Sequence, residues 1–254
     1  MSSAPEASTV PRLVLPSDGA ALPSGVRFVR APQPIEFPDE EKVGETRWHL
    51  ELKTILFQSL KLAFADQAVV GCDQFVYWNP TDPTECLAPD AFVRLGEPDR
   101  TFRSWKTWER GAPHLAVEVV SDSDARDANW IVNFDKYRRL GVFELVRFDP
   151  DAERKLRIWN LEGNDLIERE LADGSARSLC LPGHWLIVVH PELGPSLRLS
   201  RDSAGCSLYL TPAEHEAEAR KAETEARKAE TEARKAAEQR VAELEAELSR
   251  LRNG

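Results

Sequence analysis

The chain has 254 residues, of which 42% are hydrophobic and 30% charged. These values are ordinary for a globular protein and predict a domain of about 200 residues with an appendage. The formal net charge of −10 excludes a protein that coats nucleic acid by bulk electrostatics, but not one with a local DNA-binding cleft. No apolar run approaches the roughly 18 residues of a membrane helix. For this reason no membrane partner is expected. The four cysteines are scattered, as in reduced thiols, which predicts a cytoplasmic protein.

Three zones follow one another along the chain. Residues 1–40 hold seven prolines and little periodicity, which predicts an extended or partly disordered arm. Residues 41–212 carry nearly all the aromatic side chains and are expected to form the globular domain. Residues 213–254 contain no proline and no aromatic residue, and their many charges predict a helix.

The predicted body alternates helical and extended patterns, which indicates a mixed α/β fold. Apolar residues from Trp48 to Ala63 recur at helical spacing, and Gly141 is placed to end a second helix. In chain order the sequence predicts a helix over 45–64, strands over 69–78, 87–95 and 115–120, a helix over 126–140, and strands over 142–148 and 156–161.

The tail is a seven-residue repeat. The segment from Glu218 to Thr224 recurs immediately afterwards, so that alanines follow a 3-4 spacing, and the apolar stripe then continues with large side chains at Val241, Leu244, Leu248 and Leu251. Such a stripe is typical of a coiled-coil seam, although an alanine stripe buries little area. The tail therefore predicts either a coiled coil that joins copies of the chain into a homo-oligomer or a single solvated helix.

Two acidic residues interrupt apolar strands of the predicted body. Glu118 lies inside the segment from Leu115 to Val120, and strand alternation places it on one face with Ala116. Asp90 lies in the middle of the preceding predicted strand or at its mouth. A carboxylate in such surroundings is costly unless a cation or a donor meets it. Together they predict an oxygen-rich pocket suited to Mg²⁺ or Mn²⁺; singly, each would be a strand-end residue that holds a loop.

The order of these motifs resembles a known family. Pro89-Asp90 is followed by Glu118 to Ser121, then by Tyr137, Gly141-Val142, Glu144 and Asp149-Pro150. This combination is similar to the Uma-two family of restriction endonucleases, which belongs to the PD-(D/E)XK nuclease superfamily. The resemblance runs from about Glu45 to Pro212 and implies a restriction-endonuclease-like α/β core of helix, mixed sheet and helix.

The resemblance also implies a chemistry and its residues. Asp90 corresponds to the Asp of the PD element and Glu118 to the Glu of the ExK element, and in this superfamily such a pair holds one or two divalent cations. The implied activity is Mg²⁺- or Mn²⁺-dependent hydrolysis of DNA phosphodiester bonds. The alternative is a catalytically silent nuclease fold that serves as a scaffold and acts through its coiled coil.

The chain departs from the family at the lysine. The resemblance implies a lysine on the helix after Glu118, four residues before Tyr137, and this position is Asn133. Lys136 lies three residues further on and shares a helix face with Asn133 and Asn129, so it is the candidate catalytic cation. The alternative is that Lys136 is solvated and the site lacks its cation.

Two further features carry weaker predictions. Glu45 on the first predicted helix is a candidate third metal ligand, because in the superfamily that the chain resembles an acidic residue on a helix often joins the metal site. His49 on the same helix is expected to be a surface or packing residue. The segment 100–110 mixes aromatic and basic residues. It is either a surface for base stacking and phosphate contacts or a structural flap over the sheet.

Overall fold

The computed structural model describes residues 46–120, 127–171 and 175–252. Its centre is a six-stranded sheet with the strand order β1-β4-β6-β7-β8-β9. β6 and β7 pair in parallel and the other neighbours are antiparallel. The predicted α/β class with a mixed sheet is therefore confirmed. The strands are β1 (Ala68–Gly71), β4 (Ala91–Leu95), β6 (Leu115–Val119), β7 (Glu144–Phe148), β8 (Leu156–Glu162) and β9 (Asp165–Glu168).

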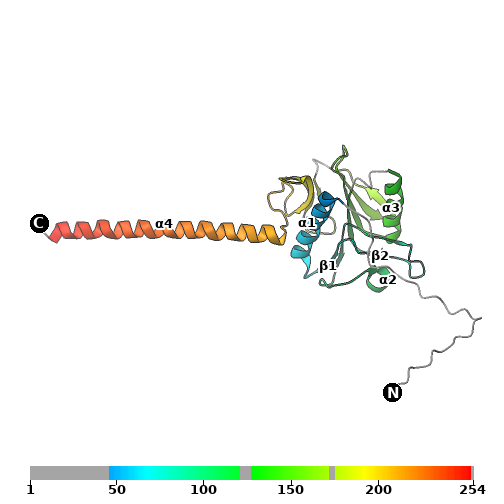
Figure 1. Ribbon diagram of the computed structural model, residues 1–254, viewed down its shortest axis with the longest axis horizontal. Helices are drawn as coiled ribbons and strands as arrows, with labels where there is room; N and C mark the ends of the chain where they lie inside the picture. The colour runs from blue at the N-terminus through cyan, green and yellow to red at the C-terminus, as the bar shows by residue number, and fades with distance from the viewer. Residues whose placement is uncertain (1–45, 121–126, 172–174, 253–254) are drawn as a thin grey trace, which may run out of the picture. The chain divides into compact units, whose positions relative to one another are not determined.

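Two helices cover the two faces of this sheet. α1 (Arg47–Phe64) begins at Thr46, whose hydroxyl accepts a hydrogen bond from a backbone N–H of the first turn. Its apolar stripe packs on one face, and α3 (Asp127–Leu140) packs on the other (Figure 1). α3 ends at Gly141, which has φ +76°, as its position after the helix predicts. Figure 1 shows α1 and α3 on opposite sides of the strands.

The predicted strands over 69–78 and 87–95 are wrong in extent. The first breaks after β1, because Asp73 takes a left-handed backbone (φ 65°) and its N–H donates to the carbonyl of Pro89 at 2.9 Å. The second divides near Pro89, which has no N–H to give to a sheet. The separated pieces form another sheet with the order β3-β2-β5, made of β2 (Val76–Tyr77), β3 (Cys86–Leu87) and β5 (Trp105–Lys106).

Two of the three aromatic residues of segment 100–110, Phe102 and Trp105, serve packing, whereas Trp108 is 40% exposed. Trp105 of β5 is fully buried, and its indole N–H donates to Gly111 O at 2.8 Å. The ring of Phe102 lies 5.3 Å from that of Trp105, and the Arg110 guanidinium lies over the indole. β5 leads directly into the single turn of α2 (Thr107–Arg110). This segment therefore matches the structural flap better than a base-stacking surface.

A third sheet lies beyond the elements that the sequence predicts. It has the order β10-β11-β12, with β10 (Ser175–Arg177), β11 (His184–His190) and β12 (Gly194–Ser200). Trp185, Leu197 and Leu199 of this sheet belong to the same core as α1. Glu144 at the start of β7 is fully buried and accepts hydrogen bonds from Ser178 and from the Trp185 indole. This carboxylate therefore joins the third sheet to the central one.

The predicted tail helix is α4 (Pro212–Arg252), a single uninterrupted helix (Figure 1). Thr211 and Glu214 cap it reciprocally, each side chain accepting from the backbone N–H of the other. The Arg198 guanidinium donates two hydrogen bonds to Glu214, which fixes the first turn on β12. None of the described helices is both long enough and apolar enough to cross a membrane. Whether α4 pairs with another copy stays a prediction.

Candidate active site

The two predicted acids lie on neighbouring strands of the central sheet. β4 and β6 pair so that Ala91 is opposite Val117, and one step further along the same register Asp90 comes opposite Glu118. Glu118 is on the face of β6 that carries Ala116, as strand alternation predicts, and this face packs against α3. The structure thus brings Asp90 and Glu118 to adjacent positions at one end of the sheet.

Asp90 is held by a strand and by a helix. The residue is 6% exposed, and one carboxylate oxygen, Oδ2, accepts a hydrogen bond from the Val119 N–H at 2.7 Å. The Nε2 atom of His49 lies 3.3 Å from the same carboxylate and 2.9 Å from the carbonyl oxygen of Val119. His49 is buried in the first turn of α1. It is therefore a packing residue, one of the two expected possibilities, and its imidazole also contacts the carboxylate of the candidate site residue Asp90.

Glu118 is held from the opposite face of the sheet. Its carboxylate is half-buried and accepts a hydrogen bond from the phenolic hydroxyl of Tyr137 on α3. The Tyr137 ring is fully buried in the core beneath the helix. Because a ring fixed by packing has few accessible rotamers, this hydrogen bond restricts where the Glu118 carboxylate can point. Tyr137 thus has a polar function in addition to the core packing that helical spacing predicts.

Lys136 contacts a different part of the chain. Its Nζ atom donates to the carbonyl oxygen of Cys86 on β3 at 3.2 Å. Asn133 lies one turn before Tyr137 and is half-buried. Lys136 would have to leave Cys86 to reach a phosphate beside the two carboxylates. Glu45 and the side chain of Asn129 lie outside the part of the chain that the structure describes.

A buried lysine that the sequence does not single out lies on α1. Lys53 follows His49 by one turn, and its Nζ atom is 2.5 Å from a carboxylate oxygen of Asp73. Burial raises the pKa of the neighbouring Cys72 thiol, and the carboxylates of Asp73 and Asp90 raise it further, while Lys53 opposes them. In the sequence, His49 and Lys53 could have been noticed because they lie one turn apart within the apolar stripe of a predicted helix, where polar residues are unusual.

The donor set suits a hard divalent cation. Within the described residues, no three side chains of His, Cys, Asp or Glu gather closely enough to bind a metal by themselves. Mg²⁺ usually binds through one or two carboxylates, keeps several waters, and takes further oxygens from a substrate phosphate. Asp90 and Glu118 supply two carboxylates on adjacent strands. They fit such an ion, and they offer no sulfur or paired imidazoles for a softer one.

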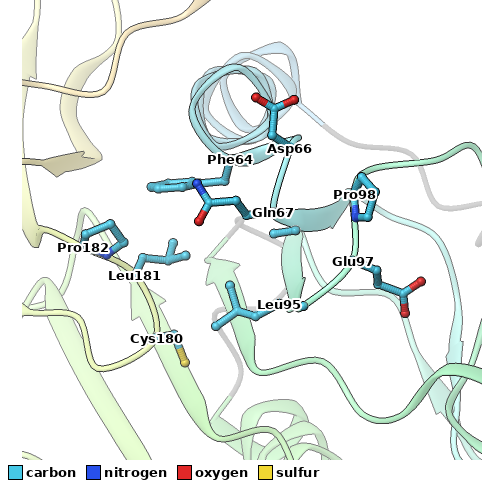
Figure 2. A pocket seen from close by; sticks show the side chains of 11 residues that line it. Phe64, Asp66, Gln67, Leu95, Glu97, Pro98, Cys180, Leu181 and Pro182 are labelled. Atoms are coloured by element: carbon cyan, nitrogen blue, oxygen red, sulfur yellow. The ribbon is translucent and has the colours of Figure 1, made fainter.

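A hollow of about 500 Å³ lies at the other end of β4. Figure 2 shows Phe64, Gln67, Leu95 and Leu181 around it, with Asp66 and Glu97 at its margin. β4 runs from Ala91, beside Asp90, to Leu95 at this hollow. The two places are therefore separated by the length of the strand, and the hollow is not part of the carboxylate site.

Comparisons with known proteins identify a family and one similar solved structure. The model of the Uma2 family, described as "Putative restriction endonuclease", matches residues 29–189, which is more than half of the chain. The chain therefore belongs to the Uma2 restriction endonuclease family. A crystal structure described as a "putative nuclease belonging to DUF820 from Anabaena variabilis" matches with 13% identity and a TM-score of 0.36, covering 61% of this chain and 78% of that one. None of the curated proteins compared with the chain matches it.

Proposed function

We propose that the protein is a metal-dependent endonuclease that hydrolyses DNA phosphodiester bonds, with Asp90 and Glu118 as ligands of Mg²⁺ or Mn²⁺. The observation that carries the proposal is the pair of carboxylates on adjacent strands, each fixed by a helix on a different face of the sheet. Membership of a restriction endonuclease family supports the same class of substrate. Glu45, which lies just before α1, is the third proposed ligand.

Each protein group has a defined task in this proposal. Asp90 and Glu118 would hold the divalent ion, which would supply a water molecule of lowered pKa and positive charge near the scissile phosphate. The Val119 N–H and His49 orient Asp90 before the ion binds. The Tyr137 hydroxyl orients Glu118. Preorganisation of this kind reduces the reorganisation that the reaction would otherwise require.

Mn²⁺ calorimetry and plasmid nicking test the proposal together. Glu118→Gln preserves the shape and an oxygen acceptor for Tyr137 but removes the negative charge, so it should abolish Mn²⁺ binding and Mg²⁺-dependent nicking without unfolding the protein. Asp165→Asn is the matched control, because Asp165 is an exposed acid on β9, far along the sheet order from β6. A Glu118→Gln protein that binds Mn²⁺ like the parent would show that Glu118 is not a ligand.

The cation that the sequence offers is Lys136. In this role its amine would leave the Cys86 carbonyl and meet the negative charge of the phosphate. Lys136→Ala should then reduce nicking while Mn²⁺ binding persists, and Asn133→Lys, which restores the family's lysine, should increase it. Equal nicking by Lys136→Ala and the parent would assign the positive charge to another side chain.

A second function, in assembly, is supported by α4. Val241, Leu244, Leu248 and Leu251 are exposed at coiled-coil spacing on a helix of 41 residues. Such a seam is suited to a second copy of the same helix, in which identical apolar stripes cover one another. We propose a homo-oligomer joined through α4, with the nuclease fold as its scaffold. If the parent protein cuts no DNA and the Glu118→Gln variant still assembles, assembly is favoured over hydrolysis as the function.

A further inference from the structure

Arg147 lies on the strand next to Glu118 and directly opposite it. β6 and β7 pair in parallel with Glu118 opposite Arg147, and neighbouring strands are about 4.8 Å apart. Each of the two strands is buried at every position except the fourth, which is half-buried. The fourth residue is Glu118 in β6 and Arg147 in β7. The two side chains therefore emerge on the same face of the sheet, the face that packs against α3.

The surroundings of Arg147 hold its guanidinium in place and leave part of it unused. The side chain is 11% exposed, and one Nη nitrogen lies 3.1 Å from a carboxylate oxygen of Asp149. The guanidinium carbon lies 4.7 Å from the ring centre of Trp130 on α3, a cation–π distance. The Nε atom is buried and has no hydrogen-bond partner within the described residues. A guanidinium presents five N–H donors, and the ion pair with Asp149 uses one Nη nitrogen, so the other Nη nitrogen of Arg147 retains donors for an anion.

The helix position that lost its lysine lies between the residues that contact this pair. Trp130, Asn133 and Tyr137 recur at spacings of three and four and so share one stripe of α3. Trp130 contacts Arg147, and Tyr137 donates to Glu118. A lysine at position 133 would therefore approach the Glu118–Arg147 pair from the helix, whereas Arg147 approaches Glu118 from the sheet.

We propose that Arg147 supplies the fixed positive charge at the scissile phosphate in this protein, in the place of the absent helix lysine, and that Lys136, which must first leave the Cys86 carbonyl, adds only a second, mobile charge. The inference rests on the proposed nuclease function and identifies a catalytic residue for it. The juxtaposition that carries it is Glu118 and Arg147 on paired strands, beneath the helix stripe of Asn133.

The chemistry requires a fixed cation at this point. In phosphodiester hydrolysis a water oxygen bonds to phosphorus, the bond from phosphorus to the departing sugar oxygen breaks, and a proton from the water ends on that oxygen. Negative charge grows on the phosphate in between, and a guanidinium meets phosphate oxygens with paired hydrogen bonds. Trp130 and Asp149 hold Arg147 before the substrate arrives. Arg147 stays protonated throughout and transfers no proton.

The next strand provides a matched control. Arg157 on β8 is the register partner of Arg147 on its other side. It donates two hydrogen bonds to Glu168, at 3.0 and 2.6 Å, and lies over the Trp159 ring. Arg157 thus matches Arg147 in side chain, in sheet face and in its contact with an aromatic ring. It differs in lying one strand further from Glu118 and in donating two hydrogen bonds to a carboxylate.

The experiment compares Arg147→Gln, Arg157→Gln and the double variant Arg147→Gln with Asn133→Lys. Plasmid nicking in Mg²⁺ gives kcat and KM, Mn²⁺ calorimetry reports the metal ligands, and thermal unfolding reports the fold. Arg147→Gln should lower kcat by about 10²- to 10³-fold with Mn²⁺ affinity retained. Arg157→Gln should leave kcat within about threefold, and the double variant should recover at least about tenfold over Arg147→Gln. Where Arg147→Gln lowers the melting temperature, Arg147→Lys retains the charge and should keep more activity than Gln.

Each contrary result overturns a definite statement. Equal nicking by Arg147→Gln and the parent refutes the inference. Loss of Mn²⁺ binding in Arg147→Gln also refutes it, because Arg147 would then act only by positioning Glu118. No recovery in a folded double variant shows that Asn133 and Arg147 do not share one function. If the parent and Asn133→Lys both bind Mn²⁺ and neither cuts DNA, the nuclease function itself is refuted and the inference falls with it.

Discussion

Replacement of Asp90 by alanine separates the structural function of this carboxylate from its proposed metal binding. Asp90 accepts a hydrogen bond from the Val119 N–H at 2.7 Å and lies 3.3 Å from His49 Nε2. All three residues are buried, so water does not replace the lost acceptor. A buried donor left without a partner costs about 1–3 kcal/mol. Asp90→Ala should therefore lower the free energy of unfolding by about this amount.

Thermal unfolding in metal-free buffer measures this effect. For a domain of 150–250 residues, 1 kcal/mol corresponds to about 2–4 °C, so Asp90→Ala should melt about 2–12 °C below the parent. Asp90→Asn keeps a carbonyl oxygen for the Val119 N–H and should lose less than half as much. Both variants should lose Mn²⁺ binding in calorimetry, because neither retains the negative charge.

Electrostatic repulsion predicts the opposite sign. Two carboxylates on adjacent strands repel each other when no cation lies between them, and removal of one relieves that repulsion. If Asp90→Ala melts at or above the parent temperature in the absence of metal, repulsion outweighs the hydrogen bonds. The conclusion that the Val119 N–H and His49 fix Asp90 would then be wrong.

Three further predictions concern the rest of the molecule. Combining Leu244→Glu with Leu248→Glu should lower the subunit number measured by light scattering, and an unchanged number would place the contact outside α4. Burial alone would raise the pKa of Glu214, but hydrogen bonds from Arg198 hold it below its usual value. The ionised carboxylate therefore stabilises the fold above about pH 4.3. This stability is lost as the pH falls through the lower pKa of the folded state. The melting temperature should therefore fall more steeply with acid in the parent than in Glu214→Gln, and parallel curves would contradict this. Gly71→Ala would overlap a fully buried phenyl ring of β4 and should cost about 1–3 kcal/mol in urea unfolding; an unchanged midpoint would show that the ring can move aside.

Hydrophobic periodicity predicts those elements whose two faces differ in a regular way. α1 and α3 have one buried stripe each, and β6 alternates between two apolar cores with Glu118 as the exception. The end of β1 is different, because the apolar residues continue beyond Gly71 while the backbone turns at Asp73. That turn depends on a hydrogen bond to Pro89, which is distant in the sequence. Periodicity contains no information about such a contact.

The candidate site shows the same division between local and long-range information. The motif order singles out Asp90 and Glu118 as candidate site residues, and the structure places their strands side by side. It does not identify His49, whose helix lies far away in the sequence from both acids. Arg147 is also overlooked, although a lone basic residue in a buried strand resembles the lone acid Glu118 in β6. Only the register between β6 and β7 shows that the two positions coincide.

The separation between the two carboxylates depends on the packing of both helices. α1 fixes Asp90 through His49, and α3 fixes Glu118 through Tyr137, from opposite faces of one sheet. Close-packed interiors transmit strain, so a cavity beneath either helix, as in Leu52→Ala, should change this separation without touching a carboxylate. Loss of Mn²⁺ binding in a core variant is therefore no evidence for a ligand. A ligand is identified only where an isosteric change, such as Glu118→Gln, abolishes Mn²⁺ binding at an unchanged melting temperature.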